Sequence, residues 1–322
     1  MQEKMFGFLN VYKPQNITSH DVVAILRKIT KVKQIGHTGT LDPFAQGVLP
    51  ICIGKATRLI EYLDDEKEYL AEISFGKSTD TYDIDGKIVS ECDQEIGLKD
   101  IENGLEAFKG EILQTPPIYS ALKVKGKKLY EYARNGEDVK IEPRKVFIEK
   151  IELKNFDEKT QKAQVLIKCS KGTYIRSIAH DLGQNLKVGA YLSQLIRTQA
   201  GKFLIDEAIR LDEIKTMEDV QKHLINPPEM LDFEQVVITE DEHKKIVMGQ
   251  CIEKPEPQTI RTPHPNPPPQ GGREHPQNST YFPQYNQNNL QKDNFLILVY
   301  NNNISAIGIV NNNQIKAKKV FL

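Results

Sequence analysis

The 322-residue sequence predicts an α+β fold, with a mixed, largely antiparallel sheet flanked by helices and a small C-terminal β domain. Strand and helix patterns mix over residues 1 to about 230 without the strict alternation of a doubly wound fold. At the C-terminal end, short apolar runs are separated by turn residues, which is typical of strands in a small β domain. These runs lie at 295–300, 306–310 and 318–322.

The first predicted helix follows a capping box formed by Thr18 and Asp21. Apolar side chains then recur at helical spacing, which predicts one face packed against the core. They are Val22, Ile25, Leu26 and Ile29.

Two segments alternate between apolar and polar residues and are predicted to be strands, 69–75 and 163–169. In the first, one face carries Tyr69, Ala71, Ile73 and Phe75.

A second amphipathic helix is predicted after residue 173, with Thr173 as its N-cap and with Tyr174 and Arg176 in its first turn. Its apolar face consists of Ile175, Ile178, Ala179, Leu182 and Leu186.

A proline-rich segment at about 255–290 interrupts the C-terminal part of the chain. Nine of the 17 prolines lie between Pro255 and Pro283, in a stretch too poor in apolar residues to form a core, so we expect it to be disordered. Because residues 238–251 before it also have a folded pattern, it is expected to interrupt the small domain. The predicted domains are therefore 1–235 and 236–322.

Charge and cysteine content limit the function classes. The net charge is −1, so no global excess indicates a polyanionic partner, although a local basic face is sufficient for one. The four cysteines are scattered, which argues against a zinc site or disulfide framework and favours a reducing compartment. With no apolar run long enough for a signal peptide or a membrane span, we expect a cytoplasmic protein.

One candidate catalytic carboxylate lies in the segment GHTGTLDPFAQGVL (36–49). Glycine, threonine and proline make this segment a loop, and Pro43 biases Asp42 towards an extended conformation. An isolated Asp-Pro most often organises a turn, but the flanking His37 and the glycines also suit close approach to a ligand.

Three further motifs accompany this loop in order along the chain, TDTYDIDG (79–86), QTPPIYSALKVKGKKLYEYAR (114–134) and SKGTYIRS (170–177). Together, the four motifs resemble those of the bacterial tRNA pseudouridine-55 synthase family. The resemblance covers about 5–235. It resumes at 236–254 and 291–322, where the pattern is similar to that of the PUA RNA-binding domain of the family.

This resemblance implies the pseudouridine synthase fold. It also implies isomerisation of uridine 55 in the TΨC loop of tRNA, with neither cofactor nor metal. The family carboxylate that acts in glycosidic cleavage corresponds to Asp42. Tyr69 matches the tyrosine that stacks on the flipped uracil and assists proton removal, and Arg176 matches the arginine that pairs with the carboxylate.

Three further pocket residues follow from the resemblance alone. Tyr174 lines the pocket, Leu195 forms its floor, and His37 occupies the space vacated by flipped bases. Without the family, Tyr174 and Leu195 would be assigned to the core, and His37 would have no role. The chain departs from the family pattern at Asn16, usually glycine, and at Ile196, usually arginine.

Local charge predicts an RNA-binding surface. Residues 123–150 carry nine Lys or Arg against five Asp or Glu, beside Tyr119, Tyr130 and Tyr132, and residues 27–33 add four positive charges. The predicted partner is the T arm of tRNA, bound by a monomer. The proposed contacts to the RNA backbone are Lys13, Lys123, Lys125, Lys127 and Lys128.

Two other functions are to be compared with this prediction. A glycosidase needs a second carboxylate opposite Asp42, and no motif supplies one. A non-catalytic protein that binds or folds tRNA is the alternative, since binding can coexist with catalysis.

Overall fold

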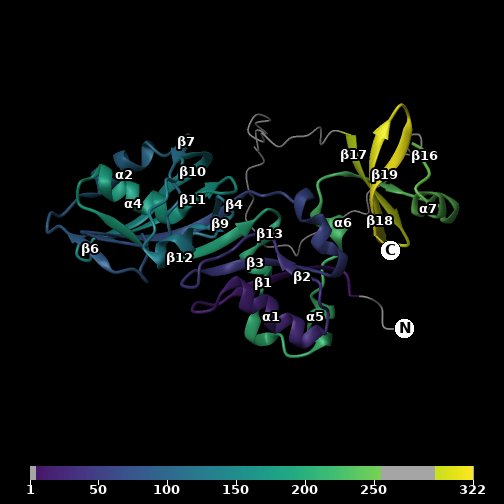
Figure 1. Ribbon diagram of the computed structural model, residues 1–322, viewed down its shortest axis with the longest axis horizontal. Helices are drawn as coiled ribbons and strands as arrows, with labels where there is room; N and C mark the ends of the chain where they lie inside the picture. Colours follow the sequence, from purple (N-terminus) through teal and green to yellow (C-terminus); the bar gives the residue numbers. More distant parts are fainter. Residues whose placement is uncertain (1–4, 255–293, 322) are drawn as a thin grey trace, which may run out of the picture. The chain divides into compact units, whose positions relative to one another are not determined.

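The computed structural model describes residues 5–254 and 294–321. The chain divides into two compact units, Met1–Met230 and Leu231–Leu322 (Figure 1). The predicted boundary at 235/236 falls inside strand β15 (Glu234–Val237), which belongs to the second unit. The predicted disordered insertion at about 255–290 lies outside the described residues.

The first unit contains a ten-stranded sheet. Only two of its strand pairs are parallel, β1 with β14 and β3 with β12, so the predicted mixed, largely antiparallel sheet is confirmed. The main path runs β14 (Ile209–Arg210), β1 (Gly7–Lys13), β3 (Gln46–Ile53), β12 (Ala190–Ala200), β4 (Lys67–Phe75), β11 (Lys162–Cys169), β10 (Arg144–Asp157) and β7 (Gly110–Gln114), with β13 (Phe203–Leu204) beside β12 and β2 (Ile35–His37) beside β3.

Two short hairpins lie outside this sheet, β5 (Lys77–Thr79) with β6 (Ile88–Glu91) and β8 (Lys123–Val124) with β9 (Lys127–Lys128). Helices flank the sheet in two groups, with α1 and α5 in contact near β1 and β2, and α2 and α4 in contact beside β10 and β12 (Figure 1). The helices of the first unit are α1 (Ser19–Thr30), α2 (Leu98–Glu106), α3 (Leu129–Asn135), α4 (Ile175–Asn185), α5 (Met217–Lys222) and α6 (Pro227–Met230), with 3-10 turns at Gly54–Tyr62, Ile205–Glu207 and Leu211–Glu213.

Helix α1 begins as its capping box predicts. The Thr18 hydroxyl accepts a hydrogen bond from the Asp21 amide, and the Asp21 carboxylate accepts one from the Thr18 amide. Val22 and Leu26 are buried, but Ile25 is 38% exposed, so its predicted core position is wrong. The buried stripe runs instead through Val23, two positions before Ile25.

Helix α4 begins differently from the prediction. Its N-cap is Tyr174, without a side-chain cap, and the Thr173 hydroxyl instead donates to the Ser170 carbonyl. Arg176 lies in the first turn as predicted. The helix packs so closely on β12 that a Cβ at Gly183 would lie 2.1 Å from the Ala190 nitrogen. Only glycine allows this approach.

The centre of the sheet sets the register of the site residues. In the antiparallel β4–β12 pair, Tyr69 is opposite Arg197 and Ala71 is opposite Leu195. Directly paired residues share a face of the sheet, so these four side chains lie together. On the other side, Gly47 of β3 pairs with Arg197, where any Cβ would clash with the Arg197 backbone.

The second unit has a five-stranded sheet in the order β15-β17-β18-β19-β16, with helix α7 (Glu240–Val247). Strands on both sides of residues 255–293 pair in this one sheet. The three predicted C-terminal strands are present, the last two beginning earlier than predicted. These three strands are β17 (Phe295–Tyr300), β18 (Asn303–Asn311) and β19 (Gln314–Val320), and β15 and β16 (Ile252–Glu253) complete the sheet.

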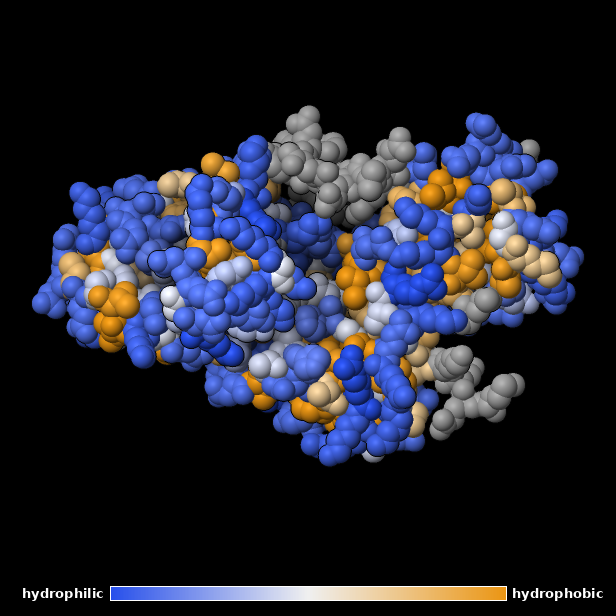
Figure 2. Space-filling model, in the orientation of Figure 1, coloured by the Kyte–Doolittle hydropathy of each residue, from blue (hydrophilic) through white to orange (hydrophobic). Residues whose placement is uncertain are grey.

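The surface in view is mainly hydrophilic, with small apolar patches scattered over it (Figure 2). Most buried apolar side chains of the first unit instead belong to a cluster around β4, β11, β12 and the inner faces of α1 and α4. Among the described residues, no helix is both long and apolar enough to cross a bilayer.

Candidate active site

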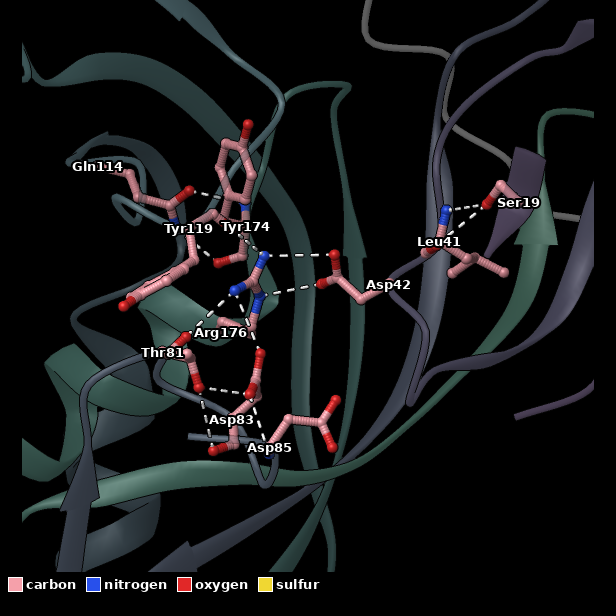
Figure 3. A network of polar contacts seen from close by, with 10 residues as sticks. All are labelled: Ser19, Leu41, Asp42, Thr81, Asp83, Asp85, Gln114, Tyr119, Tyr174 and Arg176. Atoms are coloured by element: carbon pink, nitrogen blue, oxygen red, sulfur yellow. Dashed lines mark hydrogen bonds and ion pairs between the residues drawn. The ribbon is translucent and has the colours of Figure 1, made fainter. Parts of the chain in front are cut away.

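The candidate carboxylate, Asp42, lies in the loop between β2 and β3, and its side chain is 33% exposed. The preceding residue fixes this loop. The Leu41 amide donates to the Ser19 hydroxyl at 2.8 Å, and that hydroxyl donates to the Leu41 carbonyl at 3.0 Å (Figure 3). Ser19 begins α1, so the N-terminus of this helix anchors the backbone on one side of Asp42.

The residue after Asp42 is fixed in a similar way. The Pro43 carbonyl accepts hydrogen bonds from the Asn16 amide at 2.8 Å and from the Lys13 ammonium at 3.3 Å. Asn16 has φ 65°, a left-handed conformation that glycine and asparagine adopt most readily. The replacement of the usual glycine by Asn16 therefore leaves this turn possible.

Lys13 does not match its predicted contact with the RNA backbone. The residue is 0% exposed, and its ammonium also donates to the carbonyls of Pro14 and Ile17 at 2.8 and 2.7 Å. Burial lowers the pKa of Lys13 to about 8. An ammonium surrounded by three backbone carbonyls holds the loop together and is not presented to a phosphate, so this prediction is corrected.

Arg176 binds Asp42 at two points. Arg176 Nε lies 2.9 Å from Asp42 Oδ2, and Nη2 donates to Asp42 Oδ1 at 3.3 Å (Figure 3). The arginine is only 5% exposed. Arg176 Nη1 donates to the Thr81 carbonyl at 3.1 Å, and Nη2 also donates to the Tyr119 carbonyl at 3.0 Å. The planar guanidinium is therefore fixed on several sides, and it fixes the orientation of the Asp42 carboxylate.

A second carboxylate, Asp83, faces the same arginine, with Oδ2 3.2 Å from Arg176 Nη1. Its other oxygen accepts hydrogen bonds from the Thr81 hydroxyl at 2.5 Å and the Asp85 amide at 3.1 Å. Burial raises the pKa of Asp83, opposed by the Thr81 hydrogen bond and the charge of Arg176. Asp83 was not singled out as a site residue, although its motif was.

Tyr174 is held through its backbone. Its amide donates to the Gln114 side-chain oxygen at 2.7 Å, and the Gln114 side-chain nitrogen donates to its carbonyl at 3.0 Å. One turn further along α4, the Ser177 hydroxyl donates to the Thr115 carbonyl at 2.9 Å. The end of β7 and the residue after it therefore fix the start of the helix that carries Arg176.

Tyr69 lies on β4 beside Arg197 of β12, and both side chains are buried. Burial raises the pKa of Tyr69 to about 12, and the charge and hydrogen bonding of Arg197 oppose this shift. The charge of Asp42 also raises the pKa of Tyr69. Tyr69 is therefore a neutral phenol at physiological pH.

Arg197 is a site residue that the sequence reasoning missed. Its side chain is 0% exposed and donates to the carbonyls of Val48 and Gly39 at 2.7 and 3.0 Å. These bonds connect β12 to the loop that carries Asp42. Burial, together with Arg197 and His20, lowers the pKa of His37, so this half-buried histidine is neutral at physiological pH.

The other predicted residues lie in two places. Leu195 is buried on β12, opposite Ala71 and two residues before Arg197, close to Tyr69. The lysines of the β8–β9 hairpin lie on a separate element from the Asp42 loop. Lys123 and Lys125 are exposed without an ion pair in the described part of the chain, whereas Lys127 pairs with Glu137 at 2.7 Å and Lys128 lies over the Tyr130 ring.

The site therefore combines a partly exposed carboxylate, a buried arginine that orients it, and a neutral tyrosine. Within residues 5–254 and 294–321, no cluster of three His, Cys, Asp or Glu side chains could hold a metal ion.

Two family models cover this region. The TruB family pseudouridylate synthase (N terminal domain) matches residues 27–175, and the tRNA pseudouridylate synthase B C-terminal domain matches residues 176–232. The chain is 48% identical over 252 residues to tRNA pseudouridine synthase B of Carboxydothermus hydrogenoformans, covering 76% of this chain and 85% of that protein. This chain belongs to the TruB family. It is a pseudouridylate synthase, an isomerase, as the motifs predict.

A second TruB relative, tRNA pseudouridine synthase B of Clostridium tetani, is 46% identical over 239 residues, covering 73% of this chain and 82% of that protein. Among solved structures, an H/ACA RNP bound to a substrate RNA containing 2'-deoxyuridine aligns with a TM-score of 0.60 at 22% identity, covering 98% of this chain and 85% of that chain. At this identity the likeness shows a shared fold, which confirms the predicted pseudouridine synthase fold.

Proposed function

We propose that this TruB protein converts uridine 55 in the TΨC loop of tRNA to pseudouridine, with Asp42 as the catalytic carboxylate. The observation that carries this proposal is the two-point contact between the partly exposed Asp42 and the buried Arg176. Asp83, the other carboxylate on this arginine, is 7% exposed. Asp42 is therefore the carboxylate that a flipped nucleotide can reach.

The reaction is an isomerisation within one nucleotide. The bond from N1 to C1′ breaks, the uracil rotates, and C5 bonds to C1′; C5 then loses its proton while N1 gains one. A carboxylate acts as nucleophile or as base in glycosidic cleavage, whereas an amide does neither. Because Arg176 fixes both Asp42 oxygens, the carboxylate is already oriented before RNA binds.

Tyr69 suits two roles in this reaction. Its ring presents an aromatic face on which an extruded uracil can stack, offsetting part of the cost of unstacking. With a pKa of about 12, its hydroxyl is protonated at rest. We therefore assign it to relaying the C5 proton as a neutral hydroxyl.

RNA binding is assigned to the β8–β9 hairpin, where Lys123 and Lys125 are exposed and without ion pairs in the described residues. Such charges are the ones that replace counterions on a phosphate backbone. The names of the TruB relatives specify tRNA as their substrate, which supports tRNA as the partner. The T arm follows from the proposed target, uridine 55. All four cysteines are unpaired, which supports the cytoplasm as the compartment.

The experiment uses a tRNA transcript whose uridines carry tritium at C5, because pseudouridine formation releases this label. We expect one equivalent of tritium per tRNA, and none from a matched transcript with cytidine at position 55. Release from both transcripts would show that another uridine is the target. No release from either would overturn the proposed function.

A further inference from the structure

Tyr82, between Thr81 and Asp83, has a backbone conformation that is rare for its residue type. Its φ of 65° lies in the left-handed region, where a tyrosine is strained. Such a conformation persists only when surrounding contacts stabilise it. Strained residues of this kind cluster at functional sites, and Tyr82 lies between two residues that contact Arg176.

The Tyr82 ring stacks on His180, with ring centroids 3.8 Å apart and planes inclined by 15°. His180 follows Arg176 by four positions on α4, so both side chains lie on the same face of the helix. In the described residues no hydrogen bond reaches His180 Nδ1, and burial lowers the pKa of this imidazole, which keeps the ring neutral. The neutral His180 ring is therefore held against Tyr82 by stacking.

The conformation of Tyr82 determines what its neighbours present to Arg176. The Thr81 carbonyl accepts from Arg176 Nη1 at 3.1 Å, and the Asp83 carboxylate lies 3.2 Å from the same nitrogen. The Tyr82 carbonyl accepts from the Leu192 amide of β12 at 3.0 Å. If Tyr82 relaxed to a negative φ, the carbonyl before it and the carboxylate after it would no longer converge on one guanidinium.

We propose that Tyr82 and His180 form a positioning pair, which holds the Thr81–Asp83 turn against α4 so that Arg176 stays aligned with Asp42. This inference rests on the proposed roles of Asp42 and Arg176 in catalysis. In the described residues, no hydrogen bond or ion pair joins either side chain to Asp42 or Arg176. Their effect passes through the turn to the guanidinium and from there to the catalytic carboxylate.

The test compares variants that keep or remove the ring. Tyr82→Phe keeps the stack, Tyr82→Asn tolerates the left-handed backbone without the ring, and His180→Ala removes the other half. Ile84→Asn is the matched control, because Ile84 is an exposed apolar residue of the same loop. Each is measured for single-turnover rate at saturating enzyme, tRNA affinity and melting temperature.

We expect Tyr82→Phe and Ile84→Asn to keep rates within about threefold of the parent. Tyr82→Asn and His180→Ala should each slow the reaction by about tenfold or more, with tRNA affinity within about threefold. The double variant Tyr82→Asn/His180→Ala should be no slower than the slower single variant, because each single change already removes the same stacking contact.

Two results would overturn the inference. In the first, Tyr82→Asn and His180→Ala turn over at the parental rate and differ only in melting temperature, which would give the stack a purely structural role. In the second, the two effects multiply in the double variant, which would show that the rings act independently. Turnover by Asp42→Asn would instead refute the proposed function, so the two failures are distinguishable.

Discussion

Arg176 Nε lies 2.9 Å from Asp42 Oδ2, although 134 positions separate the two residues in the chain. The contact exists because two local structures are fixed independently. Ser19 holds the backbone beside Asp42, and Gln114 holds the backbone at the start of α4. The orientation of the carboxylate therefore depends on the fold as a whole.

Arg176→Lys should slow turnover by about 100-fold with little loss of tRNA affinity. A lysine keeps the positive charge but cannot bind two carboxylates and two carbonyls in one plane. Misplacing a catalytic group by about 1 Å is sufficient for an effect of this size. Single-turnover rates and filter binding test the prediction, and a rate within about threefold of the parent would show that charge alone is sufficient.

Asp83→Asn should slow turnover by about tenfold or more, because it removes the charge that holds the far side of Arg176 while keeping an oxygen for the Thr81 hydroxyl. Asp85→Asn, a change at an exposed neighbour in the same loop, is the control and should have no comparable effect. Equal rates for the two variants would contradict a role for Asp83 in orienting the arginine.

Asp181→Asn should stabilise the protein above about pH 6. Burial raises the pKa of Asp181 from 3.8 to about 6, and in the described residues no hydrogen bond or ion pair reaches its carboxylate. Between pH 3.8 and about pH 6, the folded state therefore binds more protons than the unfolded state. The parent protein consequently loses stability as the pH rises through this range.

The gain for Asp181→Asn, discounted for partial exposure, should be about 1 kcal/mol, or roughly 2 to 4 °C in melting temperature. It should vanish below about pH 3, where the parental carboxyl is protonated in both states. Melting scans across this range measure it, with the exposed Asp93→Asn as the control. A difference independent of pH would show that the charge of Asp181 is not its cause.

Lys123→Gln/Lys125→Gln should reduce the slope of log affinity against log salt by about 1.4 to 1.8, because each phosphate contact contributes roughly 0.7 to 0.9. Lys109→Gln/Lys154→Gln is the matched control, since those lysines already pair with Glu106 and Glu152. An unaltered slope in the hairpin variant would place the RNA-binding surface elsewhere.

The sequence predicted what local patterns encode. Alternation placed Tyr69 on a buried strand face, and the capping box placed the start of α1. Longer-range contacts were not predictable in this way. Lys13 has the charge of a phosphate ligand, yet its ammonium is enclosed by carbonyls, two of them from its own loop. Arg197 and Gln114 act through backbone groups distant in the chain, which no local spacing reveals.

The central claim is that the Asp42 carboxylate performs the chemistry. It is tested most directly by tritium release from tRNA labelled at uridine C5, measured for the parent and for Asp42→Asn under single-turnover conditions. The account predicts release by the parent and none by the variant, with tRNA affinity within about tenfold, because the amide nearly preserves shape but is neither nucleophile nor base. Appreciable release by Asp42→Asn would contradict it.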